Sequence, residues 1–106
     1  MKKLQTIIAV LFLVSVLFAE DSGIITGTIS DKDTGETLPG VQITIENTDL
    51  GAVTNIDGYF EIHKIPAGKY ELFVEYLGYT SIKILGVDVA GDSTTTVNLK
   101  MELANL

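Results

Sequence analysis

The stretch Y-E-L-F-V-E-Y at residues 70–76 decides the fold, because apolar and acidic side chains alternate along it. Successive side chains of a β-strand point to opposite faces, so a period of two gives one apolar face and one polar face. Phe73 is the exception, since it falls on the same face as the two flanking glutamates. The residues of the apolar face are Tyr70, Leu72, Val74 and Tyr76.

The same period of two continues on both sides of this stretch, and turn residues such as Asp57-Gly58 and Pro66-Ala67-Gly68 separate the segments. No segment after residue 20 carries a sustained helical stripe of apolar residues. Short strands at this spacing predict two sheets packed face to face, an all-β, seven-stranded antiparallel sandwich. The expected strands are 25–29, 41–46, 59–63, 70–76, 82–84, 87–89 and 97–103, with Ile43, Phe60, Leu72, Val74 and Leu99 facing inward.

The N-terminus has the composition of a secretory signal. Lys2 and Lys3 precede an apolar run at 4–18, and the small residue Ala19 follows it. A retained membrane anchor is the alternative, but the run is shorter than the roughly 20 residues that span a bilayer. We therefore expect a signal peptide at 1–19, with cleavage after Ala19, and one domain at 20–106 that does not span the membrane.

The charge balance excludes several partners. The chain has 14 acidic residues and seven lysines without any arginine, a net charge of −7, and loss of Lys2 and Lys3 makes it −9. Such a domain repels phosphate backbones, so nucleic-acid binding is not expected. The chain has no cysteine, so its stability must come from the apolar core rather than from disulfides.

The inventory of reactive side chains predicts a protein that is not an enzyme and needs no cofactor. His63 is the only histidine in the chain, and it falls on the polar face of an expected strand. A catalytic zinc site needs three protein ligands, and a nucleophile needs a base beside it. One histidine cannot supply the zinc ligands by itself, and any nucleophile would have to use the same His63 as its base.

Two acidic turns could be taken for calcium loops. Asp31 and Asp33 form a D-x-D-x-G pattern at 31–35, and Asn55 and Asp57 frame a second turn. Glu36 comes too early to close an EF-hand-like loop, which takes its bidentate ligand from position 12. Asp and Asn also bond their own backbone two residues on, so we interpret both segments as ordinary turns and expect no metal.

Three aromatic residues, Tyr59, Phe73 and Tyr79, are the candidate contacts for a ligand or partner. An aromatic ring beside polar groups can stack on a sugar, and an exposed ring can anchor a protein interface. The alternative is packing within the sandwich, and Tyr79 after Gly78 is most simply a turn residue. Phe73 either contacts a partner or packs under a neighbouring loop.

Four segments, in this order and spacing, resemble the carboxypeptidase regulatory-like domain. The resemblance implies a transthyretin-like sandwich of seven strands. It also implies the setting of such domains, which commonly open TonB-dependent outer-membrane receptors just after the signal peptide. The segments are I-T-G-T-I-S-D-K-D-T-G-E-T-L-P-G-V-Q-I-T-I at 25–45, T-N-I-D-G-Y-F-E-I at 54–62, I-P-A-G-K-Y-E-L at 65–72 and E-Y-L-G-Y at 75–79.

The resemblance and the residues together predict an accessory, protein-interacting module of the bacterial cell envelope. It would be periplasmic, associated with the outer membrane, or secreted, and its partner would be a protein. Two alternatives remain open at this point. One is a carbohydrate-binding module that uses Tyr59, Phe73 or nearby loops, and the other is the truncated leading fragment of a TonB-dependent receptor.

Overall fold

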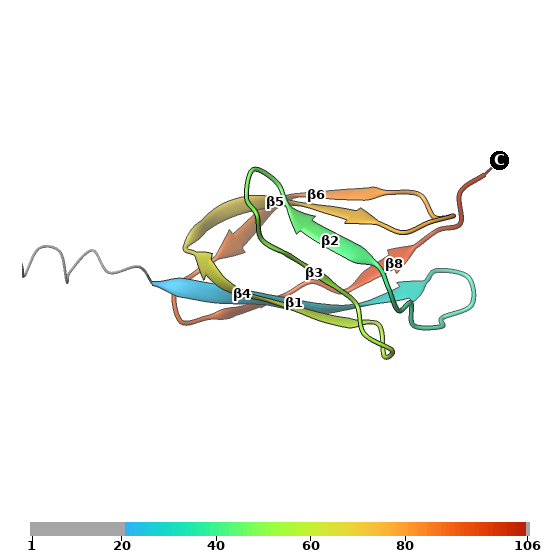
Figure 1. Ribbon diagram of the computed structural model, residues 1–106, viewed down its shortest axis with the longest axis horizontal. Helices are drawn as coiled ribbons and strands as arrows, with labels where there is room; N and C mark the ends of the chain where they lie inside the picture. Colours follow the sequence, from blue (N-terminus) through green and yellow to red (C-terminus); the bar gives the residue numbers. More distant parts are fainter. Residues whose placement is uncertain (1–20, 106) are drawn as a thin grey trace, which may run out of the picture.

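The computed structural model describes residues 21–105, which form two β-sheets packed face to face (Figure 1). The predicted all-β sandwich is confirmed. None of the described residues is helical, so no helix in 21–105 is long and apolar enough to cross a membrane. The predicted signal peptide at 1–19 lies outside the described residues.

Each sheet has four strands. The first sheet is built on β1 (Ser22–Asp31), with β4 (Tyr59–Pro66) on one side and β7 (Thr94–Thr96) and β8 (Leu99–Met101) in succession on the other. The second sheet has the order β3 (Gly51–Val53), β2 (Gln42–Ile45), β5 (Gly68–Glu75) and β6 (Ile82–Val89).

The structure has eight strands where seven were predicted. The predicted segments 82–84 and 87–89 form the single strand β6. Gly86, with φ +66°, lies in the irregular part of this strand, opposite the register shift between Tyr70 and Leu72 of β5. The short strand β3 escaped prediction, since its three residues begin with a glycine that continues the preceding turn signal. The last predicted strand, 97–103, begins three residues too late and is divided in the structure, since β7 precedes it and β8 covers only 99–101.

The division of the last strand lies at Val97 and Asn98, beside Gly27 of β1. A Cβ atom on Gly27 would lie 1.8 Å from the Val97 carbonyl oxygen, so only glycine permits this approach. The Asn98 side chain continues the pairing, because its Oδ1 accepts the backbone N–H of Thr28 at 3.0 Å. The strand is thus interrupted without a change of register, because Thr26 pairs with Thr96 before the interruption and Ile29 with Leu99 after it.

The predicted antiparallel pairing does not extend to β7 and β8, which run parallel to β1. Parallel neighbours require a long crossover, and here the five strands β2 to β6 lie between β1 and its parallel partner β7 along the chain. As a result, the described chain begins at one end of the sandwich and leaves at the other (Figure 1).

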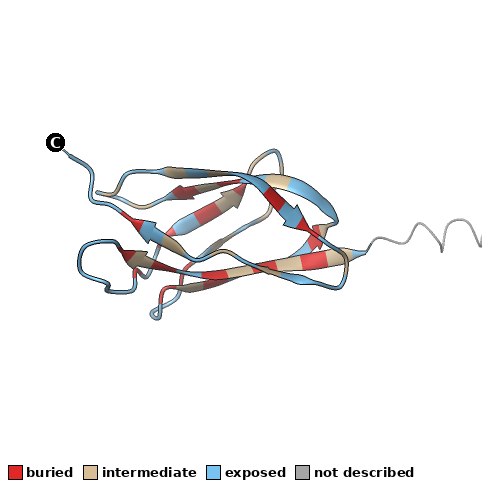
Figure 2. Cartoon of the chain, turned by 180° about the vertical axis from the view of Figure 1, so that it is seen from behind, coloured by how far each residue is buried: buried red, intermediate tan, exposed pale blue. Residues whose placement is uncertain are grey.

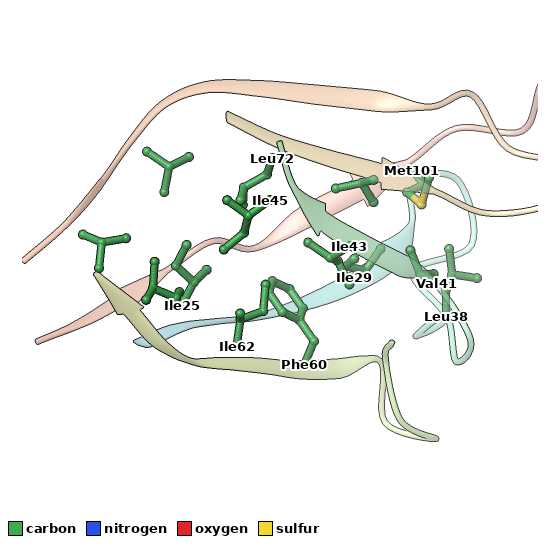
Figure 3. Packing of buried hydrophobic residues seen from close by; sticks show 14 residues of the cluster. Ile25, Ile29, Leu38, Val41, Ile43, Ile45, Phe60, Ile62, Leu72 and Met101 are labelled. Atoms are coloured by element: carbon green, nitrogen blue, oxygen red, sulfur yellow. The ribbon is translucent and has the colours of Figure 1, made fainter. Parts of the chain in front are cut away.

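The core lies between the two sheets and consists of the inward residues of both (Figure 3). Of the predicted inward residues, four are fully or almost fully buried, and Leu99 is half-buried against the same cluster. Gln42, one position out of phase, is exposed, which confirms the register of β2. The alternation of buried and exposed residues runs along most strands (Figure 2). The four confirmed residues are Ile43, Phe60, Leu72 and Val74.

Candidate interaction site

Tyr79 links two segments of the chain at one end of the sandwich. Its hydroxyl donates to Oδ2 of Asp31 at 2.6 Å, which joins the turn after β5 to the end of β1. Asp31 is only 5% exposed, and its Oδ1 accepts the N–H groups of Asp33 and Thr34 at 2.8 and 3.0 Å. The hydrogen bond of the Tyr79 hydroxyl is therefore made within the domain, which gives this candidate a structural role.

These hydrogen bonds shift the pKa values of Asp31 and Tyr79 in opposite directions. The Tyr79 hydroxyl, followed by the N–H groups of Thr34 and Asp33, holds the pKa of Asp31 below its ordinary value. The hydrogen bond to the Asp31 carboxylate and partial burial raise the pKa of Tyr79 to about 12. Both directions mean that the folded domain favours the pair in which Asp31 is ionised and Tyr79 keeps its proton.

The two acidic turns use their side chains as the sequence interpretation expects. Asp31 bonds the backbone of its own turn, and Oδ1 of Asn55 accepts the N–H groups of Asp57 and Tyr59 at 2.9 and 3.0 Å. Across residues 21–105, His, Asp and Glu side chains form no group of three that could hold a metal ion. The absence of a metal requirement stays a prediction.

Tyr59 lies on the outer face of the first sheet, in a row of hydrogen-bonded side chains along β4. Its hydroxyl donates to Oε1 of Glu61 at 2.7 Å, and Nε2 of His63 lies 2.7 Å from Oε2 of the same carboxylate. The Tyr59 hydroxyl and then the His63 ring lower the pKa of Glu61, and the bond to Glu61 raises the pKa of Tyr59. The glutamate of this face therefore has two partners within its own strand.

Phe73 lies on the outer face of the second sheet. Tyr59 lies on the first sheet, and Tyr79 lies in the turn after β5. Phe73 stands in β5 between Thr44 of β2 and Lys83 of β6 in the strand register. Phe73 is half-buried, yet it does not belong to the set of apolar residues that pack against the core. The ring therefore does not pack against the core, and the choice between a partner contact and packing under a neighbouring loop stays a prediction.

The sequence analysis places two glutamates beside Phe73 but missed the third, Glu46, because its position depends on strand register. Glu71 and Glu75 share the outer face of β5 with Phe73. Glu46 extends β2 and donates its N–H to the Glu71 carbonyl at 2.9 Å, so the two glutamates stand directly opposite each other. The ion pairs of the described residues do not include any of these three glutamates.

We call this surface the Phe73 face and define it by Phe73, Glu46, Glu71, Glu75 and Lys83. A second lysine further along β5 does not compensate it, since Lys69 Nζ pairs with Asp88 at 3.9 Å. The face therefore has three carboxylates and one lysine around a half-buried aromatic ring. The structure does not bring Tyr59, Phe73 and Tyr79 together.

Comparison with known proteins agrees with this fold. The family model of the CarboxypepD_reg-like domain matches residues 25–106. The chain belongs to this family. The resemblance predicted from the four segments is confirmed. The TonB-dependent receptor P39 of Formosa agariphila is 33% identical over 82 residues, which make up 77% of this chain but only 7% of the receptor.

Solved structures share the sandwich. A chain of a mutant type II cohesin–X-dockerin complex from Acetivibrio cellulolyticus superposes with a TM-score of 0.67 at 26% identity, over 79% of this chain and 60% of that one. The minor pilin GBS52 of Streptococcus agalactiae gives a TM-score of 0.61 at 17% identity, over 82% of this chain and 47% of the pilin. The pilin similarity supports the fold alone.

Proposed function

We propose that the chain is a non-catalytic protein-interaction module of the bacterial cell envelope, of the kind found in TonB-dependent receptors. The observation that carries the proposal is the match to the P39 receptor, in which the domain is a small accessory part of a much longer protein. The placement of the reactive side chains agrees with it. His63 and Glu61 bond each other on an exposed strand, and Asp31 and Tyr79 are used by the frame.

Export is part of the proposal and rests on the sequence of residues 1–19. N-terminal sequencing of the protein recovered from the cell envelope should begin at Glu20. Recovery of the chain with Met1 in an inner-membrane fraction would contradict export and favour the retained anchor.

The interaction is tested in the producing cells by replacing single residues at the surface with a photo-crosslinking amino acid. Thr28 samples the first sheet, Phe73 the second, and Leu77 the turn after β5. We expect an adduct of higher mass, sensitive to protease, at one or more of these positions. Binding on a glycan array without any protein adduct would instead support the carbohydrate-binding alternative.

A further inference from the structure

We propose that the Phe73 face binds an extended protein segment that presents basic, apolar and basic side chains at every second residue. The inference rests on the proposed function and specifies both the surface and the chemistry of the partner. Three features of the face carry it: a half-buried ring that does not pack against the core, an unfavourable pair of glutamates, and the spacing of the residues along β5.

The ring of Phe73 is the apolar anchor. The ring is half-buried and does not pack against the core between the sheets, so it keeps some apolar surface in contact with water. No further layer of residues within 21–105 covers this sheet. Aromatic side chains at the centre of a surface, surrounded by polar ones, are typical anchors of protein interfaces. The exposed part of the Phe73 ring therefore offers such an anchor on this face.

The opposed glutamates give the sign of the partner. Like charges directly opposite on neighbouring strands destabilise a sheet, and Glu46 and Glu71 are such a pair. A sequence that tolerates a local conflict of this kind commonly does so at a functional position. A lysine or arginine placed between the two carboxylates would remove the repulsion and form two ion pairs. The partner is therefore basic where it meets these residues.

The spacing gives the pattern of the partner. Glu71, Phe73 and Glu75 are successive outward residues of one strand, about 6.8 Å apart for an extended chain. An extended segment laid along β5 presents its own side chains at the same interval. A basic, an apolar and a second basic residue at alternate positions would then meet Glu71, Phe73 and Glu75 in turn.

The same charges argue against other occupants. A second copy of this chain would present the same carboxylates and would be repelled, as would an anionic lipid surface. The outer face of the first sheet is a poor competitor for a basic segment, because Glu61 already bonds Tyr59 and His63. This face therefore provides the matched control within the same molecule.

The test is an NMR titration of the exported, isotope-labelled protein with the synthetic peptide Thr-Lys-Thr-Leu-Thr-Lys-Thr. We expect amide shifts at Thr44, Phe73 and Lys83 and none at Thr26 or Thr28. Binding should weaken strongly in 1 M salt, where the screening length falls to about 3 Å. No shifts at millimolar peptide, or equal shifts on the two faces, would overturn the inference.

Two variants and one peptide complete the test. Glu71→Gln should weaken binding about two- to fivefold, whereas Glu61→Gln should leave it unchanged. The melting temperature of Glu71→Gln should stay at or above that of the wild type, which separates lost binding from lost folding. A peptide with glutamate in place of both lysines should not bind. Equal binding of the two peptides, or of Glu71→Gln and the wild type, would refute the charge match.

Photo-crosslinking separates this inference from the function on which it rests. An adduct at Phe73 that Glu71→Lys abolishes supports both. Adducts only at Thr28 or Leu77 would leave the interaction module intact and refute the Phe73 face as its site. The absence of adducts at all three positions would refute the proposed function itself.

Discussion

The two outer faces of the sandwich differ in how far their charges are satisfied. On the first sheet, Glu61 accepts a hydrogen bond from the Tyr59 hydroxyl and bonds the His63 ring, so both of its carboxylate oxygens have a partner within β4. On the second sheet, Glu46 and Glu71 face each other beside a half-buried ring that does not pack against the core. The same frame thus carries one face that is complete in itself and another that a partner could complete.

The largest expected effect separates an inward phenylalanine from an outward one. Phe60→Ala should destabilise the domain by about 3–5 kcal/mol, because the buried ring leaves a cavity between the sheets. Phe73→Ala should cost less than about 1 kcal/mol, since it removes no core contact. Urea denaturation of both variants measures the difference. Similar losses in the two would show that Phe73 supports the fold and would remove the contrast between the faces.

The next test concerns the frame that both faces share. Tyr79→Phe removes the hydrogen bond to Asp31 and should lower the melting temperature near neutral pH. Because the pKa of Asp31 is lowered from 3.8, its stabilisation is present above that value and disappears as the pH falls through the folded pKa. Because the pKa of Tyr79 is raised from 10.0 to about 12, its stabilisation is complete below 10.0 and disappears as the pH rises toward about 12.

Melting curves of wild type and Tyr79→Phe across this pH range measure the effect. The gap between the two proteins should be widest from about pH 4 to 10 and should close on both sides. Tyr59→Phe is the matched control, since its hydroxyl bonds an exposed carboxylate on the first sheet. A gap of constant size at every pH would show that the Tyr79 hydroxyl is not bonded to an ionised Asp31.

A smaller effect compares the glutamates of the two faces directly. Glu71→Gln should raise the melting temperature by about 1–5 °C, because it removes a like-charge pair across two strands. Glu61→Gln should lower it, since the pKa of Glu61 is lowered by the Tyr59 hydroxyl and the His63 ring and the ionised form is therefore favoured in the fold. Calorimetry at pH 7 measures both. Changes of the same sign would contradict the difference between the faces.

The smallest expected effect is no change at all. Millimolar Ca²⁺ and excess chelator should give the same melting temperature, because Asp31 and Asn55 bond the backbone of their own turns. A rise of many degrees with Ca²⁺, abolished by Asp33→Ala or Asp57→Ala, would contradict the turn interpretation. It would also show that the acidic residues that bind a ligand lie in the turns rather than on the Phe73 face.

The sequence predicts the features that depend on the alternation of apolar and polar residues along one strand. The inward positions of Ile43 and Leu72 and the outward position of Phe73 follow from a period of two within one strand. The opposition of Glu46 and Glu71 could not be predicted, because residues 25 positions apart meet only through the register of β2 and β5. The division of the last strand was hidden for a similar reason, since it depends on how closely Val97 approaches Gly27.

The parallel pairing of the first and last strands has a mechanical consequence. A pull applied to the described chain at Asp21 and Asn105 acts along β1 and, in the opposite sense, along β7 and β8. The hydrogen bonds of a parallel pair are evenly spaced, so they share such a load in shear instead of opening one after another. Resistance to tension is then set by the rate at which this whole seam gives way. The sandwich can therefore act as a tether that transmits tension between whatever is attached at its two ends.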